Sequence, residues 1–158
     1  MHETQTAVLL HNIRSAHNVG SIFRTSDAAG VQKIYLSGYT PCPIDTFKRQ
    51  QKDIAKTALG AEKNVPWEYI KNPQKIINKL RKEGWSIVGV EQDEHSNDYR
   101  DALPQKKMFV FGNEVSGLSR SMRAGCDVLI EIPMRGKKES LNVSVAAGIV
   151  LFAHGKNI

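Results

Sequence analysis

Residues 7–37 read AVLLHNIRSAHNVGSIFRTSDAAGVQKIYLS and predict a strand, a helix and a second strand in succession. Four apolar residues open the stretch, and residues 33–37 form a second short strand-like run. Between them, apolar side chains recur at helical spacing over residues 18–29, with Asn18 as the expected cap and Gly30 as the expected stop. Two strands joined by a helix are typical of a parallel sheet.

The remaining sequence continues this alternation. A helix is expected from Pro73, with Asn72 as its cap, to a stop at Gly84. We expect further strands at residues 86–90, 108–111 and 128–132, and a polar, basic helix within residues 45–61. The pattern predicts one α/β domain over residues 1–158, with a mainly parallel sheet flanked by helices.

A last helix is expected at residues 141–153. It is apolar on nearly all sides, with Val143, Val145, Ile149, Val150, Leu151 and Phe152. A helix of this kind is usually buried, so we expect it in the core or in an interface.

The composition favours a cytoplasmic protein with an affinity for phosphates. The chain carries 22 Lys and Arg against 16 Asp and Glu, a net charge of +6, which attracts nucleic acids, although many basic proteins bind none. Cys42 and Cys126 have no metal-ligand spacing to other residues, so we expect reduced thiols and no metal. Neither a signal peptide nor a membrane-spanning run is visible, so no membrane partner is expected.

Polar and glycine-bearing segments follow the predicted strands at residues 12–18, 90–93, 112–117 and 134–140. Parallel α/β sheets bind ligands beyond the carboxyl ends of their strands. We therefore expect these four segments to lie near one rim of the sheet.

The first segment, residues 12–30, combines a helix start with two arginines. Arg14 lies in the loop, and Arg24 lies on a helix face away from the apolar residues. Arginines near a helix N-terminus can form a phosphate-binding corner. A capped amphipathic helix with surface arginines explains the same residues equally well.

The second segment, residues 111–119, reads FGNEVSGLS and predicts a strand, a glycine loop and a short helix. The spacing mimics a phosphate loop, but Leu118 occupies the lysine position and Glu114 would repel phosphates. A carboxylate in a glycine loop suits a cationic ligand such as S-adenosylmethionine, with its sulfonium and amine. An ordinary strand–loop–helix turn is the alternative.

The third segment, residues 132–146, reads IPMRGKKESLNVSVA, and its proline and glycine indicate a loop. Ser140 is expected to cap the last helix, and capping alone would explain it. Asn142 is expected in the first turn, where a buried amide would need hydrogen-bond partners.

Together these segments resemble the three motifs of the SpoU, or TrmH-type, ribose methyltransferases of the SPOUT superfamily, over essentially the whole chain. The first motif is matched at Asn12, Arg14, Asn18, Gly20, Arg24 and Gly30, with Arg14 one position earlier than in the family pattern. The second is matched at Gly112, Glu114 and Gly117, and the third over residues 132–146. Residues 56–61, KTALGA, are similar to a further family stretch between the motifs.

The resemblance implies a C-terminal trefoil knot, which is rare among folds and which no periodicity predicts. S-adenosylmethionine would bind in the knot, held at Val90, Glu91, Gly112, Asn113, Gly117, Ile132, Met134 and Leu141. The resemblance also implies a homodimer in which Arg24 of one subunit approaches the cofactor of the other.

The implied reaction is methyl transfer from S-adenosylmethionine to a ribose 2′-hydroxyl in structured RNA. The catalytic positions would be Arg24, Asn18, Glu114, Ser140 and Asn142. The family role for Arg24 is proton acceptor, yet a guanidinium stays protonated in proteins. We therefore expect Arg24 to hold an RNA phosphate and stabilise the developing alkoxide, with the proton acceptor left open.

The RNA itself is less well defined. Motif one begins at Asn12, so we expect no extra N-terminal RNA-binding domain and recognition by the dimer surface. Candidate contacts are Arg14, Lys48, Arg49, Lys52 and Arg135. A compact dimer favours transfer RNA over ribosomal RNA. The alternatives are a SPOUT base methyltransferase and a non-catalytic RNA-binding module, although such a module would show degraded motifs.

Overall fold

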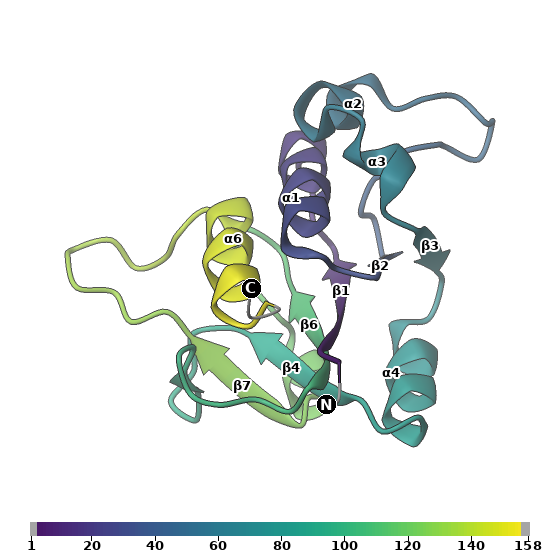
Figure 1. Cartoon of the computed structure of the whole chain (residues 1–158). Coiled ribbons are helices and arrows are strands. Elements are labelled where there is room, and N and C mark those ends of the chain that lie inside the picture. The colour runs from purple at the N-terminus through teal and green to yellow at the C-terminus, as the bar shows by residue number, and fades with distance from the viewer. Residues whose placement is uncertain (1–2, 156–158) are drawn as a thin grey trace.

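A computed structural model of the chain describes residues 3–155 and shows one β-sheet covered by helices on both faces (Figure 1). In this range the strands are β1 Gln5–His11, β2 Lys33–Ser37, β3 Trp67–Ile70, β4 Ser86–Val90, β5 Asn97–Asp98, β6 Lys106–Phe111 and β7 Val128–Glu131. The helices are α1 Ala16–Ala29, α2 Lys52–Ala58, α3 Ala61–Asn64, α4 Pro73–Lys82, α5 Arg120–Ala124 and α6 Val143–Ala153. The strand order is β3-β2-β1-β6-β4-β7-β5, and every pairing between these strands is parallel. The predicted α/β class and parallel sheet are confirmed.

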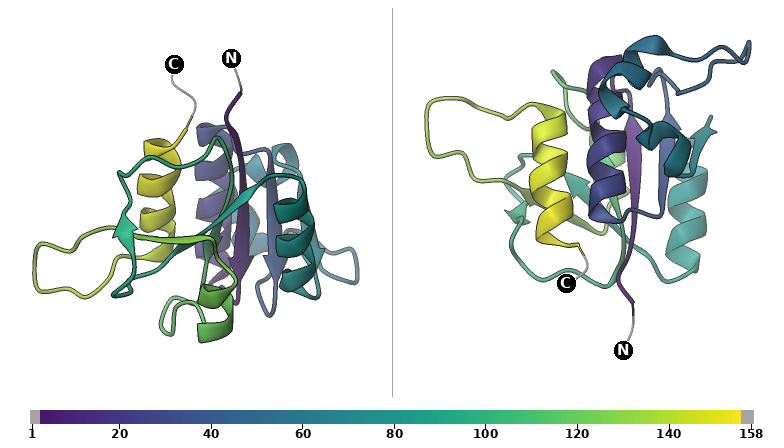
Figure 2. Two further views of the ribbon diagram at one scale, coloured as in Figure 1. Left: turned by 90° about the horizontal axis from the view of Figure 1, so that it is seen from below. Right: turned by 45° about the horizontal axis from the view of Figure 1, so that its top comes forward.

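The two faces of the sheet carry separate cores, because successive side chains of a strand point to opposite faces. In β1, Val8 and Leu10 join the core under α1, α2, α3 and α6, whereas Ala7 and Leu9 join the core under α4 and α5. Figure 2 shows α1 and α6 side by side on the first face. The all-apolar strands predicted from the sequence are therefore buried on both sides.

Helix α1 begins earlier than expected. The side chain of Ser15 caps it by accepting the backbone N–H of Asn18 at 3.2 Å, so the expectation that Asn18 is the cap was wrong. Gly30 ends the helix in the left-handed conformation, as predicted. At Gly20 the helix touches α2: a Cβ there would lie 2.0 Å from Oγ1 of Thr57, so only glycine allows this approach.

The single helix predicted within residues 45–61 is replaced by a turn, α2 and α3. The carboxylate of Asp45 accepts the backbone N–H groups of Phe47 and Arg49, which stabilises a turn where a helix was expected. Leu59 and Gly60 then adopt left-handed conformations that separate α2 from α3. Strands β3 and β5 were not predicted, because they are short and lie at the two edges of the sheet.

Residues 91–105 connect the neighbouring strands β4 and β6 by a long detour. This segment first pairs β5 with β7 at the edge of the sheet and only then returns to β6. His154, directly after α6, donates its Nε2 hydrogen to the carbonyl oxygen of Tyr99 in this segment. The C-terminal helix thus ends against residues 91–105. The trefoil knot itself stays a prediction.

Helix α6 differs from its prediction at its start and in its burial. Its cap is Asn142, whose Oδ1 accepts the backbone N–H groups of Ser144 and Val145, so the expectation that Ser140 caps the helix was wrong. Its inner face is buried, but Val145 is 50% and Phe152 is 61% exposed. The two are seven positions apart and share one helix face, which this chain alone leaves uncovered.

Two further expectations from the sequence concern membrane-spanning helices and the two cysteines. Between residues 3 and 155, no helix combines the length and the apolar character needed to cross a bilayer. Cys42 and Cys126 are free and half-buried, as expected.

Candidate functional site

A cavity of about 180 Å³ opens at the carboxyl ends of β4, β6 and β7. It is lined by Val90, Glu91, Gln92, Phe111, Gly112, Asn113, Glu114, Val115, Ser116, Gly117, Glu131, Ile132, Met134, Ser140, Leu141, Val143 and Ala146. Three of the four segments expected at one rim meet here, and all eight residues predicted to contact a cofactor are among the lining residues. This position agrees with the rule for ligand sites in parallel sheets.

The fourth segment, residues 12–18, reaches the cavity through Glu114. The carboxylate of Glu114 accepts the backbone N–H of Arg14 and that of Ser15, each at 2.9 Å. It also accepts the side-chain amide of Asn18 at 3.4 Å. The carboxylate therefore sits at the N-terminal end of α1, where the helix dipole favours a negative charge.

Asn18 also makes a hydrogen bond to the third segment, residues 132–146. Its Oδ1 accepts the side-chain amide of Asn142 at 3.2 Å, across 124 positions of sequence. A continuous chain of hydrogen bonds, Asn142–Asn18–Glu114, thus joins all three motif segments at the edge of the cavity. The expectation that the amide of Asn142 needs partners is met at the protein surface, since Asn142 is exposed.

The hydrogen bonds to Glu114 also set its protonation. Partial burial on its own would raise the pKa of Glu114, but the N–H groups of Arg14 and Ser15 and the amide of Asn18 outweigh it and lower the pKa. Glu114 is therefore a firmly ionised acceptor and a weak base. Its chemistry suits positioning and the attraction of a cation.

Asn113 anchors the glycine loop to the neighbouring segments. Its amide nitrogen donates to the carbonyl oxygen of Asn12 at 3.1 Å and to the hydroxyl of Tyr39 at 2.9 Å. Its Oδ1 accepts the backbone N–H groups of Val115 and Ser116. The side chain of Asn113 is thus occupied within the protein, which leaves the loop backbone to face a ligand.

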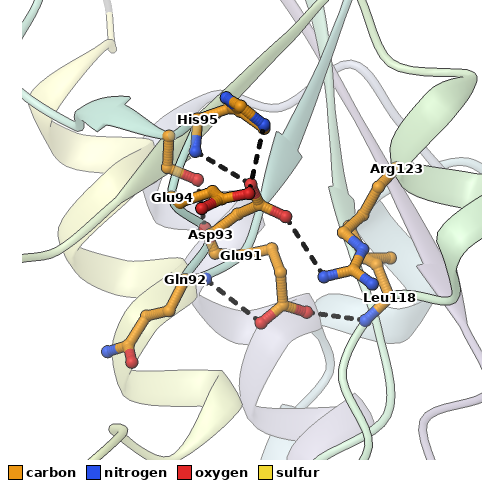
Figure 3. A network of polar contacts seen from close by, with 8 residues as sticks. Glu91, Gln92, Asp93, Glu94, His95, Leu118 and Arg123 are labelled. Atoms are coloured by element: carbon orange, nitrogen blue, oxygen red, sulfur yellow. Dashed lines mark hydrogen bonds and ion pairs between the residues drawn. The ribbon is translucent and has the colours of Figure 1, made fainter.

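Glu91 also lines the cavity, and Figure 3 shows the polar contacts around it. Its carboxylate accepts the backbone N–H of Leu118 at 2.6 Å and that of Gln92 at 3.1 Å. A Cβ on Gly117, which has a φ of +67°, would lie 2.1 Å from Oε2 of Glu91, so a side chain there would displace this carboxylate. Close by, Arg123 and Asp93 form an ion pair at 3.2 Å that fixes the rim.

The predicted catalytic residues fall into two groups. Asn18, Glu114 and Asn142 lie in one hydrogen-bond chain, and Ser140 lines the cavity. Arg24 does not line it: this residue lies on the exposed face of α1 and makes no hydrogen bond or ion pair within residues 3–155. The structure of one chain therefore brings together four of the five predicted residues.

The predicted RNA contacts are all exposed and lie in three places. Arg14 precedes α1, Arg135 lies in the loop after β7, and Lys48, Arg49 and Lys52 lie on or next to the turn before α2. No group of three or more His, Cys, Asp or Glu in the described part of the chain could hold a metal ion.

Several lining residues were missed by sequence reasoning. They are Gln92, Phe111, Val115, Ser116, Glu131, Val143 and Ala146. Five of them lie at or just after the carboxyl ends of β4, β6 and β7, where their position was an available signal, whereas Val143 and Ala146 lie on α6. Ser15 was missed as the α1 cap although its residue type is among the preferred ones.

The comparisons with known proteins agree with this geometry. The model of the SpoU rRNA Methylase family matches residues 5–152. The 23S rRNA (guanosine-2′-O-)-methyltransferase RlmB of Neisseria meningitidis serogroup B is 36% identical over 149 residues, which make up 94% of this chain and 57% of that protein. The chain thus spans little more than half the length of this curated relative.

Two solved structures show the same fold. The AdoMet-bound rRNA methyltransferase from Sinorhizobium meliloti has a TM-score of 0.86 at 30% identity, covering 97% of this chain and 56% of that one. The TrmH/SpoU tRNA modifying enzyme of A. aeolicus has a TM-score of 0.83 at 29% identity, covering 96% of this chain and 74% of that one. The family match extends over almost all of the described residues, and the chain belongs to the SpoU rRNA Methylase family, as its three motifs predicted.

Proposed function

We propose that this chain transfers a methyl group from S-adenosylmethionine to the 2′-hydroxyl of a ribose in RNA. The observation that carries the proposal is the hydrogen-bond chain Asn142–Asn18–Glu114 at the edge of the cavity. It brings the three family motifs to one place, although they are far apart in sequence. The relative RlmB is named as a methyltransferase of this type.

The cavity fits the proposed cofactor in charge and in shape. Glu91, Glu114 and Glu131 line it, and their carboxylates complement the cationic sulfonium and amine of S-adenosylmethionine. The loop at Gly112 and Gly117 packs so tightly that a Cβ on Gly112 would lie 2.7 Å from the backbone of Gly117. Both glycines line the cavity, so the loop backbone can contact an adenine and a ribose there. When bound, the cofactor supplies an electrophilic methyl group.

The cofactor contacts follow from this fit. We assign them to Val90, Glu91, Gly112, Asn113, Gly117, Ile132, Met134 and Leu141, all of which line the cavity. Ser140 lines the same cavity and is assigned to orient the ribose hydroxyl.

Arg24 acts on the RNA in this proposal. Its guanidinium stays protonated, so it binds a phosphate and stabilises negative charge on the ribose oxygen as that oxygen loses its proton. Asn18 lies six residues before Arg24 on α1, and its amide is fixed by Glu114 and Asn142. Together, Asn18, Glu114 and Asn142 position the start of α1 against the glycine loop that follows β6.

A homodimer would complete the site. Arg24 lies on the exposed face of α1, apart from the cavity of its own chain. Helix α6 packs beside α1 and leaves Val145 and Phe152 uncovered. We propose that a second copy covers this face and that Arg24 reaches the cavity of the partner.

Substitution of Arg24 tests the assignment. Arg24→Ala should lower methyl transfer at least about 100-fold, as loss of one charge-stabilising donor does elsewhere. Binding of S-adenosylmethionine, measured by isothermal titration calorimetry, should persist, because the assigned cofactor contacts all line the cavity and Arg24 acts on the RNA. Full activity of this variant would contradict the proposal.

The product and the substrate need separate measurements. Nucleoside mass spectrometry should detect a 2′-O-methylated ribose; a methylated base would instead identify a base methyltransferase. Absence of cofactor binding by the wild type would indicate an RNA-binding module.

Transfer RNA as the preferred substrate stays a prediction, and comparison of tRNA and rRNA from a deletion strain decides it.

A further inference from the structure

Phe47 is the most exposed aromatic side chain among residues 3–155, at 76%. It lies in the loop of residues 44–50, here called the basic arm, which projects beyond α2 and α3 (Figures 1 and 2). We propose that the basic arm binds an unpaired RNA base by stacking it on Phe47. This inference rests on the proposed function, since it assumes that RNA is the substrate.

The basic arm is an ordered structure. Ile44 and Gln50 form an antiparallel bridge that closes it. Inside the arm, the carboxylate of Asp45 accepts the backbone N–H groups of Phe47 at 2.8 Å and of Arg49 at 2.9 Å. These hydrogen bonds order the backbone around Phe47, whose side chain is exposed.

One face of the ring is covered by a cation. The guanidinium carbon of Arg49 lies 5.0 Å from the ring centroid of Phe47, a cation–π geometry. The same guanidinium is also held by Asp45, to which its Nε donates at 2.9 Å. With Arg49 on one face and the side chain still largely exposed, the other face is open to a planar ligand.

The surrounding charges favour a nucleic acid over an apolar protein surface. Lys48, Arg49, Lys52 and Lys56 are exposed on or next to the arm. Asp45 is engaged by Arg49 and by two backbone N–H groups, so Lys48, Lys52 and Lys56 remain available for phosphates. Aromatic rings interleaved with cations are typical of sites that stack unpaired bases.

The structure of RNA indicates which kind of RNA the basic arm should bind. A base inside a duplex presents its faces to its stacked neighbours, whereas loops and bulges expose them. The basic arm should therefore prefer a hairpin loop or bulge to a continuous duplex.

A binding experiment with two RNAs tests this preference. The probes are a short hairpin with 2-aminopurine in its loop and a blunt duplex of equal length, titrated with the full chain. Phe47→Leu keeps apolar bulk but removes the flat ring, and it should weaken hairpin binding about tenfold, the cost of one lost base stack. Duplex binding should be unchanged, and Phe47→Trp should restore hairpin affinity and the quenching of 2-aminopurine.

The controls separate the possible failures. Leu59→Ala removes another exposed apolar side chain, outside the basic arm, and should leave hairpin binding unchanged. Equal hairpin affinity of wild type and Phe47→Leu would overturn the role of the arm while leaving the proposed function intact. A change in the sedimentation of Phe47→Leu would also overturn it, because the ring would then pack on protein. Failure of the wild type to bind either RNA would reject the proposed function together with this inference.

Discussion

At the scale of single residues, Glu114 connects the glycine loop after β6 to the start of α1. Partial burial would raise its pKa, but its three hydrogen bonds favour the ionised carboxylate and lower the pKa below the ordinary 4.5. The same residue was expected to attract a cationic cofactor. The structure adds that it positions Asn18, which sequence spacing could not show.

Because the folded-state pKa of Glu114 is lowered, its stabilising effect is present above the unfolded pKa and is lost as pH falls through the folded value. We expect Glu114→Gln to be less stable than wild type at pH 7, with a difference that shrinks at pH values below about 4. Urea unfolding at both pH values measures the difference.

Glu139→Gln is the matched control, because Glu139 is exposed and makes no hydrogen bond within the described range. The difference in free energy of unfolding between Glu139→Gln and wild type should not shrink in this way at low pH. If the free energy of unfolding of Glu114→Gln differed from that of wild type by the same amount at both pH values, the carboxylate charge would have no role in folding.

At the scale of elements, the caps of α1 and α6 determine where the motif side chains are placed. Asn142 has two roles: its Oδ1 caps α6, and its amide nitrogen donates to Asn18. Ser140, the expected cap, lines the cavity instead. Stability and activity should therefore respond to different atoms of Asn142.

Asn142→Ala should lower the free energy of unfolding by about 1 kcal/mol, the usual effect of losing an N-cap. Asn142→Asp keeps the capping oxygen but loses the N–H donor, so it should retain most of this stability and lose methyl transfer. Thermal unfolding and a methyl-transfer assay on the same samples measure the two effects.

Ser140→Ala serves as the comparison and should leave stability unchanged. A loss of stability on Ser140→Ala as large as that on Asn142→Ala would indicate that Ser140 caps α6 in solution. That result would restore the expectation from sequence.

At the scale of the whole molecule, the proposed dimer explains why Arg24 lies away from the cavity of its own chain. If sites are shared, two inactive variants can complement each other. Arg24→Ala leaves the cavity intact, and Gly117→Val disrupts the cavity by displacing Glu91 but leaves Arg24 intact.

Mixing these two variants after dissociation should restore about a quarter of wild-type activity, because half of the dimers are mixed and each holds one complete site. The methyl-transfer rate of the mixture, compared with each variant alone, measures the rescue. Adding Phe152→Glu to both chains should abolish it, since a charge would then lie on the uncovered face of α6. No rescue in stable mixed dimers would mean that each site is complete within one chain.

Sequence alone determined the features that depend on neighbouring residues. The alternation of strands and helices follows from hydrophobic periodicity, and β1, β2, β4, β6 and β7 lie where short apolar runs predicted them. The rim of the sheet was also predictable, because in a parallel sheet the residues after each strand lie at one edge. The eight cofactor contacts that the family resemblance implied all line the cavity at this rim.

The tertiary structure decided what depends on residues distant in the chain. Ser15 and Asn18 are both suitable caps by residue type, but the amide of Asn18 is taken by Glu114 and Asn142, which lie 96 and 124 positions away. The placement of β6 between β1 and β4 and the edge strands β3 and β5 likewise rest on long-range pairing. Local sequence encodes the preference of each segment for helix, strand or turn; the choice among equally suitable partners is made by packing and hydrogen bonding in the folded chain.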